Sequence, residues 1–269
     1  MSDEILHRVE DSVSWIVLNR PEARNAITPD GRDRVIELLE DASRELGVRC
    51  VVLTGTGDAF CSGADLRARR DAPPRPEGAP APAAGEVARV IREGAQRLVA
   101  AILDCEKPVI AAVNGVAAGI GAHMALACDL VVARGDARFI EVFVRRGLVP
   151  DGGGAWLLPR LVGLQRAKEL MFLGDDLSVT DAARMGLVNL IVEDEDLEPE
   201  VRRLAERLAS GPTRAIALAK KLLNTSLDVD RATAFAMEAD AQEQNMTTND
   251  AQEGVRSFVE RREPEFRGW

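Results

Sequence analysis

The stretch from Pro108 to Asp129, PVIAAVNGVAAGIGAHMALACD, constrains the fold more than any other part of the chain. It begins with an apolar run rich in β-branched residues, which is typical of a buried strand. Asn114-Gly115 then predicts a turn. Gly119 and Gly121 precede a short run of good helix formers. The stretch therefore predicts a strand, a glycine-rich turn and a helix start in close succession.

A helix that begins at a glycine-rich turn has a possible chemical use. Several backbone N–H groups at a helix start lack an intrahelical partner and lie at the positive end of the helix dipole. Glycines there let a ligand approach the backbone closely. Such a turn can hold a developing oxyanion, or it can be a tight connection without chemistry. This stretch alone leaves both alternatives open.

A second unit of the same kind occurs earlier in the chain. Residues 50–54, CVVLT, predict a buried strand, and the loop GTGDAFCSGADL follows. Gly63 precedes Ala64 and Asp65, where a new helix could start. Two such units could aim two backbone N–H groups at one point.

Strands and helices alternate over the first two-thirds of the chain. Besides those above, the pattern predicts strands at 5–11, 13–19, 129–134 and 187–192, and helices at 29–46, 86–104 and 165–173. Residues 139–147 fit either a strand or a helix. From about residue 196, apolar residues recur every three to four positions, which predicts helices at 196–209, 212–225, 231–246 and 250–262. We therefore expect a core over 1–195 and a helical region over 196–269, of the kind that often packs on another subunit.

Residues 71–85, DAPPRPEGAPAPAAG, predict a flexible or disordered loop. Proline crowding blocks regular structure, and the segment has no apolar period. Because the loop follows the turn at 63–65, it could act as a lid, or it could be a plain surface excursion.

Charge and cysteine content limit the possible classes of function. The net charge of −10 argues against non-specific nucleic-acid binding. We expect buried free thiols and a reducing, cytoplasmic compartment, because no two cysteines form a CxxC pair and each lies in or beside an apolar run. These cysteines are Cys50, Cys61, Cys105 and Cys128. Two histidines and scattered acids give no metal-ligand spacing, and no apolar stretch reaches membrane-spanning length, so we expect neither a metal nor a membrane partner.

Several motifs together resemble the crotonase family, also called the enoyl-CoA hydratase/isomerase superfamily. They are LNRPEARNAIT at 18–28, AFCSGADL at 59–66, KPVIAAVNGVAAGIGAHMALACDL at 107–130, GLVPDGGGAWLLPRLVG at 147–163, LSVTDAARMGLVNLIV at 177–192 and EGVRSFVERREPEF at 253–266. The resemblance implies an α/β fold, a spiral of ββα turns that makes two roughly perpendicular sheets, followed by a helical C-terminal region that supports trimerisation. It also implies an acyl-CoA thioester substrate without a further cofactor, and a homotrimer or a dimer of trimers.

The resemblance assigns two backbone N–H donors to this chain. By position they belong to Ala64, after Gly63, and to Ile120, between Gly119 and Gly121. Removing a proton next to a thioester puts negative charge on the carbonyl oxygen, and fixed donors at that oxygen lower the barrier. Side-chain identity matters little at these positions because the backbone is the donor.

The expected acid and base depart from the family pattern. Family hydratases carry one glutamate three residues after the second donor, where this chain has His123, and another where it has Phe143. A phenylalanine can neither activate water nor deliver a proton. His123 could carry protons or guide the acyl chain, or it could be a hydrogen-bonded residue that lines the pocket. Glu141 is the nearest acid to the lost glutamate, and we do not expect it to reach the substrate.

Asp151, four residues after Gly147, offers another proton carrier. Some family isomerases and a dehalogenase have a catalytic aspartate at this position, and the surrounding sequence resembles the branch that rearranges ring-epoxide or unsaturated acyl-CoAs. One carboxylate can take a proton from one carbon and return it to another, which moves a double bond. A turn or N-cap aspartate is the alternative.

The predicted activity is therefore isomerisation of an unsaturated acyl-CoA with Asp151 as proton shuttle. The alternatives are an enoyl-CoA hydratase that uses His123 and Asp151, and a catalytically weak acyl-CoA binder or RNA-binding relative. Arg24 is expected near the CoA phosphates, and the tail residues Phe258 and Arg261 are expected to cover the nucleotide, often from a neighbouring subunit. The full expected substrate-binding and CoA-binding set is Arg24, Gly63, Asp65, Leu66, Arg67, Gly119, Gly121, Phe143, Phe258 and Arg261. Any one arginine could instead be a solvated surface charge.

Overall fold

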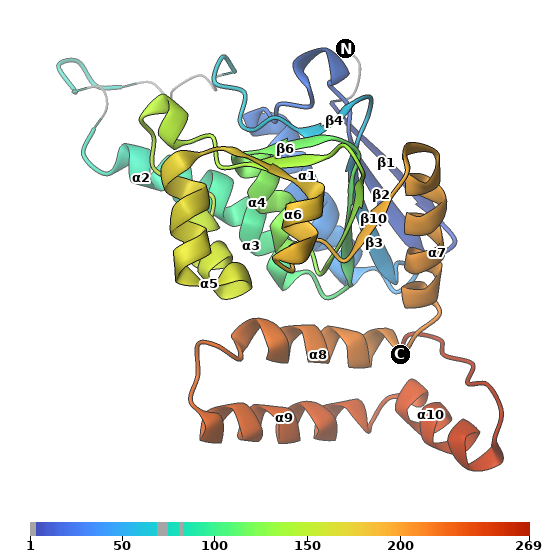
Figure 1. Cartoon of the computed structure of the whole chain (residues 1–269). Coiled ribbons are helices and arrows are strands. Elements are labelled where there is room, and N and C mark those ends of the chain that lie inside the picture. Colours follow the sequence, from blue (N-terminus) through green and yellow to red (C-terminus); the bar gives the residue numbers. More distant parts are fainter. Residues whose placement is uncertain (1–3, 69–74, 81–82) are drawn as a thin grey trace.

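The computed structural model describes residues 4–68, 75–80 and 83–269. Figure 1 shows two sheets covered by helices, with a further layer of helices beneath them. The larger sheet has six strands in the order β1 (Ile5–Glu10), β2 (Val13–Leu18), β3 (Cys50–Gly55), β5 (Val109–Val113), β7 (Leu130–Arg134) and β10 (Leu190–Val192). The smaller sheet has four, in the order β4 (Ala59–Cys61), β6 (Val116–Ala118), β8 (Arg138–Ile140) and β9 (Asp176–Ser178).

Consecutive strands alternate between the two sheets. Strands β3, β5 and β7 lie side by side and parallel in the large sheet, and each leads directly into a strand of the small sheet, β4, β6 or β8, which also pair in parallel. A helical segment then returns the chain to the next large-sheet strand. This repeat is the predicted spiral of ββα turns, and the predicted fold class is confirmed.

The helices of the core begin and end close to the predicted positions. They are α1 (Pro29–Arg44), α2 (Glu86–Ile91), α3 (Arg97–Asp104), α4 (Ile120–Ala127), α5 (Gly154–Leu173) and α6 (Val179–Arg184). The Thr28 hydroxyl accepts a hydrogen bond from the N–H of Gly31 at 2.9 Å, so Thr28 is the predicted N-cap of α1. A π-helical turn, η2 (Arg92–Gln96), joins α2 to α3.

One local prediction needs correction, one open alternative is resolved, and one prediction stays untested. No helix starts at Ala64, because this residue forms a parallel bridge with Ile27 and a turn follows. The ambiguous segment 139–147 is both a strand and a helix, since β8 is followed by the 3-10 helix η3 (Val144–Arg146). The described parts of the 71–85 loop hold no helix or strand, while 71–74 and 81–82 lie outside the described residues, so its flexibility stays a prediction.

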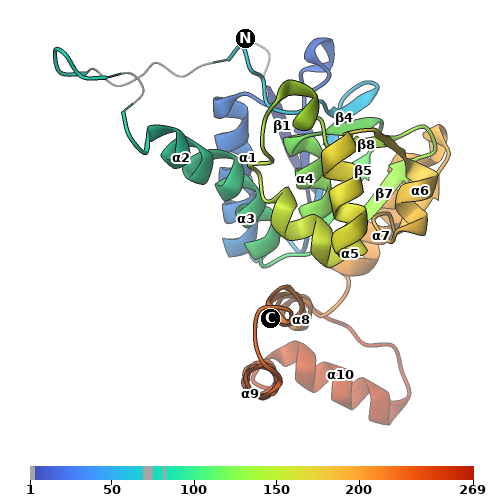
Figure 2. The same ribbon diagram turned by 60° about the vertical axis from the view of Figure 1, so that its left-hand side comes forward.

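Four helices follow the core, as predicted. They are α7 (Leu197–Ala209), α8 (Thr213–Thr225), α9 (Arg231–Asn245) and α10 (Asn249–Glu260), with the short η4 (Asp194–Asp196) before them. Helix α7 packs its buried face on the back of the large sheet. Figures 1 and 2 show α8, α9 and α10 as a layer apart from the sheets. The division at residue 195 stays a prediction, and α7 packs with the core.

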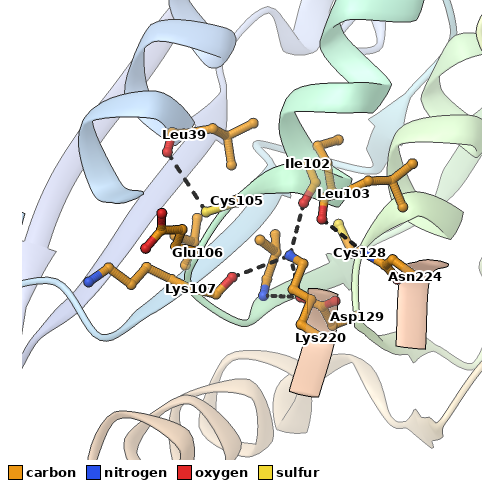
Figure 3. Close-up of polar contacts among 12 residues, drawn as sticks. Leu39, Ile102, Leu103, Cys105, Glu106, Lys107, Cys128, Asp129, Lys220 and Asn224 are labelled. Carbon is orange, nitrogen blue, oxygen red and sulfur yellow. Dashed lines mark hydrogen bonds and ion pairs between the residues drawn. The ribbon is translucent and has the colours of Figure 1, made fainter. Parts of the chain in front are cut away.

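Lys220 fastens the helical layer to the core (Figure 3). Its Nζ donates to the carbonyl oxygens of Ile102 at 2.9 Å and Lys107 at 3.3 Å, and to the Asp129 carboxylate at 2.8 Å. The same Asp129 oxygen accepts from the N–H of Val109 at 2.7 Å. Burial raises the pKa of Asp129, and the Lys220 ammonium opposes that rise. A single ion pair therefore joins α8 to the start of β5 and the end of α4.

The four cysteines are free and buried, as predicted. Burial raises the thiol pKa of Cys61 to about 11 and also raises those of Cys50 and Cys128. Across residues 4–68, 75–80 and 83–269, no helix is long and apolar enough to cross a membrane.

Candidate functional site

The two predicted N–H donors follow neighbouring strands of the small sheet. Strands β4 and β6 are parallel, with Ala59 opposite Val116 and Cys61 opposite Ala117. Because parallel strands end at the same edge of a sheet, the segments after them are brought together. Ala64 follows β4 and Ile120 follows β6, so both residues lie at this edge.

The way its loop is held leaves the N–H of Ala64 without a backbone acceptor among the described residues. Ile27 donates to the carbonyl of Gly63 at 2.9 Å, and Asp65 donates to the carbonyl of Ile27 at 2.9 Å. This parallel bridge uses the groups on either side of Ala64, so the N–H of Ala64 points away from Ile27. Gly63 has φ +113°, a value that favours glycine.

The N–H of Ile120 also lacks a backbone acceptor in the described part of the chain, for a different reason. Ile120 is the first residue of α4, where N–H groups have no intrahelical acceptor. Gly119 before it has φ 54° and ψ −124°, a conformation essentially confined to glycine. A Cβ on Gly121 would lie 2.2 Å from the carbonyl oxygen of Cys61, so only glycine lets α4 approach the end of β4 this closely. The three glycines therefore act together to bring the two N–H groups to one place.

A cavity of about 350 Å³ opens at this place. Residues 63–66 line one side of it, and Gly119 and Ile120 line another. Phe143 and Asp151 complete the set of predicted residues that share the cavity. The structure thus brings together eight of the predicted site residues from four separate segments of the chain.

Asp151 is the carboxylate of this cavity that makes no ion pair with any residue that the structure describes. It is half-buried, and burial raises the pKa of its carboxyl group, while positive charge on His123 acts in the opposite direction. Helix α5 begins at Gly154 with Gly153 as N-cap and without a side-chain cap, so Asp151 is not the N-cap of that helix. Among the described residues no ion pair reaches its carboxylate.

The other carboxylate that lines the cavity, Asp65, is already bound. It accepts from the Arg20 guanidinium at 2.9 Å and from the N–H of Arg67 at 3.0 Å. These contacts hold the pKa of Asp65 below its usual value. Asp65 thus fixes the loop that carries Ala64.

His123 lies behind the cavity and does not line it. Its side chain is completely buried, and its Nε2 lies 3.0 Å from an Oε2 of Glu141, which is also buried. The imidazole stacks on Phe143 with ring centroids 5.3 Å apart. Phe143 therefore separates His123 from the space where a substrate fits, and proton transfer by His123 stays a prediction. The sequence did not reveal the contact between His123 and Glu141, since 18 residues separate them.

Four residues that were predicted to bind CoA do not line the cavity. Arg24 and Arg67 are exposed beside the cavity on the loops that carry its wall, and neither lines it. The backbone carbonyl of Arg24 accepts from the N–H of Ser62 at 3.0 Å, so this residue also holds the Ala64 loop in place. Phe258 lies on α10 and Arg261 is the C-cap of that helix, in the separate helical layer, and Phe258 is 84% exposed.

Two arginines that line the cavity were not predicted. Arg32 comes from α1 and Arg146 from η3. The Arg32 guanidinium is held by Asp33 at 2.9 Å and packs so closely on Gly94 that a Cβ there would lie 2.5 Å from it. In the sequence, only the position of Arg146 beside Gly147 could have indicated that its side chain lines the cavity. The pattern of 139–147 fits either a strand or a helix and so does not show which way this side chain points.

The chain is similar to known proteins over almost its whole length. The family model for enoyl-CoA hydratase/isomerase matches residues 8–268. The 1,2-epoxyphenylacetyl-CoA isomerase of Escherichia coli is 38% identical over 268 residues, which span 100% of both chains. The crotonyl-CoA hydratase of Syntrophomonas wolfei is 34% identical, with 98% of each chain covered. The crystal structure of an enoyl-CoA hydratase/isomerase from Cupriavidus metallidurans matches with a TM-score of 0.88 at 37% identity, covering 99% of this chain and 97% of that one.

Proposed function

The chain belongs to the enoyl-CoA hydratase/isomerase family of enzymes, and we propose that it isomerises an unsaturated acyl-CoA through an enolate, with Asp151 as the proton shuttle. One observation carries this proposal: of the two carboxylates that line the cavity, only Asp65 forms an ion pair among the described residues. Asp65 is bound by Arg20 and by backbone N–H groups, whereas Asp151 lines the cavity and, among the described residues, makes no ion pair and hydrogen-bonds only with its own backbone N–H. The similarity to an isomerase of epoxyphenylacetyl-CoA over the whole chain supports the same choice.

The proposed reaction needs one base and one oxyanion site. The Asp151 carboxylate removes a proton from a carbon conjugated with the thioester, and the electron pair moves onto the carbonyl oxygen. The N–H groups of Ala64 and Ile120 donate to that oxygen and stabilise the enolate. The protonated Asp151 then returns the proton to a different carbon of the same conjugated system, and the double bond moves. Protons and electrons balance without any cofactor besides the CoA that belongs to the substrate.

Hydration of a 2-enoyl-CoA is the second candidate, because the chain is also similar to a crotonyl-CoA hydratase. It needs one group to activate water and another to deliver a proton. The two family positions for these groups hold His123 and Phe143. The His123 side chain is fully buried behind Phe143, which favours isomerisation.

Mass spectrometry in heavy water distinguishes the two reactions. A panel of 2-enoyl-CoAs and 3-enoyl-CoAs is incubated with the enzyme and with Asp151→Asn. We expect deuterium incorporation and a moved double bond with the parent enzyme, and loss of both with Asp151→Asn. A product heavier by one heavy-water molecule would instead identify a hydratase. Tight acyl-CoA binding without any turnover would identify a binding protein.

We also propose that the chain assembles into a homotrimer or a dimer of trimers in the cytoplasm. Apolar side chains exposed along α8, the turn after it, α9 and α10 support an assembly, since a monomer rarely leaves such a surface uncovered. They are Leu223, Leu227, Phe235, Val255, Phe258 and Val259. In such an assembly Phe258 and Arg261 would cover the nucleotide of a neighbouring copy. Four free buried thiols support a reducing compartment.

A further inference from the structure

A buried ionisable pair lies directly behind the turn that carries Asp151. His123 is 0% exposed and the Glu141 side chain 6%, and their closest polar atoms are 3.0 Å apart. Burial of two ionisable groups is costly unless they satisfy each other. The burial of this Glu–His pair therefore calls for a structural or functional role.

The imidazole shapes the turn that follows Asp151. A Cβ on Gly154 would lie 2.1 Å from His123 Nε2, and a Cβ on Gly152 would lie 3.0 Å from His123 Nδ1. The glycine run after Asp151 therefore makes room for the ring, and the ring in turn fixes the path of the backbone. Gly152 also packs on Ile120, whose Cδ1 would be 2.3 Å from an added Cβ. The same turn thus contacts both His123 and a residue of the proposed oxyanion site.

One ring nitrogen of His123 has no partner. The Glu141 carboxylate is hydrogen-bonded to Nε2, while Nδ1 is buried and makes no hydrogen bond to any residue that the structure describes. Nδ1 is the nitrogen nearest to Gly152, and a charge on the imidazole acts on the Asp151 carboxyl. Glu141 thus orients a polar ring whose remaining nitrogen lies at the Asp151 turn.

We propose that His123 and Glu141 are a positioning pair for Asp151: Glu141 orients the imidazole, and the imidazole supports the turn 151–154 from behind. His123 acts through Asp151 and does not touch the substrate, because Phe143 lies between the ring and the cavity. This inference rests on the proposed role of Asp151 as the base. It gives His123 and Glu141 a function that neither hydration nor simple packing requires.

The charge on the pair has a measurable consequence. Burial raises the pKa of Asp151, and the positive imidazole opposes this rise. Removing the positive charge therefore raises the pKa of Asp151 further, so that the base is lost at a higher pH. The other charged groups around the carboxylate line the same cavity and are unchanged in the variants: Asp65, Arg32 and Arg146.

The test follows the Asp151 carboxyl by carbon-13 NMR in enzyme without substrate, with Asp151→Asn to assign the signal. His123→Asn removes the imidazole, and Glu141→Gln removes the ion pair that orients it, so we expect Asp151 to titrate at a higher pH than in the parent in both variants. Glu141→Gln keeps the volume and one oxygen acceptor, so it carries the test if His123→Asn does not fold. The matched control is Asp129→Asn, which alters a different ion pair, that of Asp129 with Lys220 beyond the C-terminal end of α4, and should leave the Asp151 titration unchanged.

Kinetics supply the second readout. The acidic limb of kcat/KM for enoyl-CoA isomerisation should move to higher pH in Glu141→Gln, and kcat should fall by about tenfold or more because the base is displaced. KM should change by less than about twofold, since the binding wall is intact. An Asp151 titration identical in the parent and in both variants would overturn the positioning role, even if Asp151 proved to be the base. A shifted titration in an enzyme that moves no double bond would keep the positioning role and overturn the proposed function.

Discussion

At the scale of single residues, the half-burial of Asp151 trades stability for reactivity. The folded protein raises the pKa of this carboxyl above its ordinary value because water is partly removed from it. A raised folded pKa favours the folded state while the group is protonated. That contribution is fully present below the unfolded pKa and is lost as the pH rises through the folded pKa. At neutral pH the ionised carboxylate therefore destabilises the fold. Such a loss of stability is common where activity requires a partly buried charged group.

Asp151→Asn should consequently be more stable than the parent at pH 7 and inactive as an isomerase. The gain should disappear near pH 3, where the parent carboxyl is neutral in both states. Thermal unfolding at the two pH values measures this. An asparagine variant that is less stable than the parent at pH 7 would mean that the carboxylate has a stabilising partner.

Gly154 gives a second prediction at this scale. A Cβ at this position would meet the fully buried His123 ring at 2.1 Å. Gly154→Ala should lower the free energy of unfolding by about 1–3 kcal/mol, the usual cost of overpacking. Gly47→Ala is the control, because nothing lies within 4 Å of its added Cβ, and it should change stability by less than about 0.5 kcal/mol. Equal unfolding midpoints for the two variants would contradict the tight packing of the ring.

Motif spacing predicted the cavity residues well, because backbone donors and Asp151 lie within a few residues of glycines that the sequence displays. His123 was harder. Its distance from Glu141 along the chain hides the pair, and its lack of cavity contact depends on how Phe143 packs. Arg32 and Arg146 line the cavity for the same kind of reason, since only the packed fold turns α1 and η3 toward Asp151.

At the scale of elements, the sequence predicted the long helices and the buried strands, whose periodicity is strong. It missed β6, a strand of three residues between Gly115 and Gly119, because so short a run has no period of its own. It also expected a helix after Gly63, where pairing of Ala64 with Ile27 keeps the chain extended. In both cases a tertiary contact decided the local conformation.

The attachment of α8 yields a prediction about stability. Lys220→Met leaves the Asp129 carboxylate, whose side chain is only 24% exposed, without its cation. Loss of one partner from a buried pair costs about 3 kcal/mol or more, so the urea midpoint should fall clearly. The double variant Lys220→Met/Asp129→Asn should recover part of the loss. The deficit of the single variant should also shrink as the pH falls through the pKa of Asp129, which burial raises, toward about pH 4, where an ordinary aspartate becomes neutral as well. Single and double variants of equal stability would show that the pair is not what fastens α8.

At the scale of the whole molecule, a packed core and an exposed helical layer stand in contrast. Helix α4 is buried along its entire length, whereas α8, α9 and α10 leave large apolar side chains in contact with solvent. The sequence predicted this division of the chain into alternating and helical parts. It could not predict which apolar faces stay uncovered, because the amphipathic pattern of a helix is the same whether its partner is the core or another copy.

Light scattering should therefore give a mass near three or six times the 29.1 kDa of one chain. The double variant Leu227→Asp/Phe235→Asp should shift this mass toward that of a monomer, because it places charge on the apolar surface of the helical layer. Leu46→Asp, at an exposed position after α1, is the control and should leave the mass unchanged. A parent protein that runs as a monomer would contradict the proposed assembly.

The burial of all four thiols makes the protein ready for site-selective labelling. Cys50 and Cys61 are 0% exposed, Cys105 3% and Cys128 7%, so the folded chain should react slowly with maleimide reagents. A cysteine introduced on an exposed turn of α9 would then be the single labelled position, without removal of the native ones. A spin label placed there would report distances between copies directly, and the number of distances would give the symmetry of the assembly.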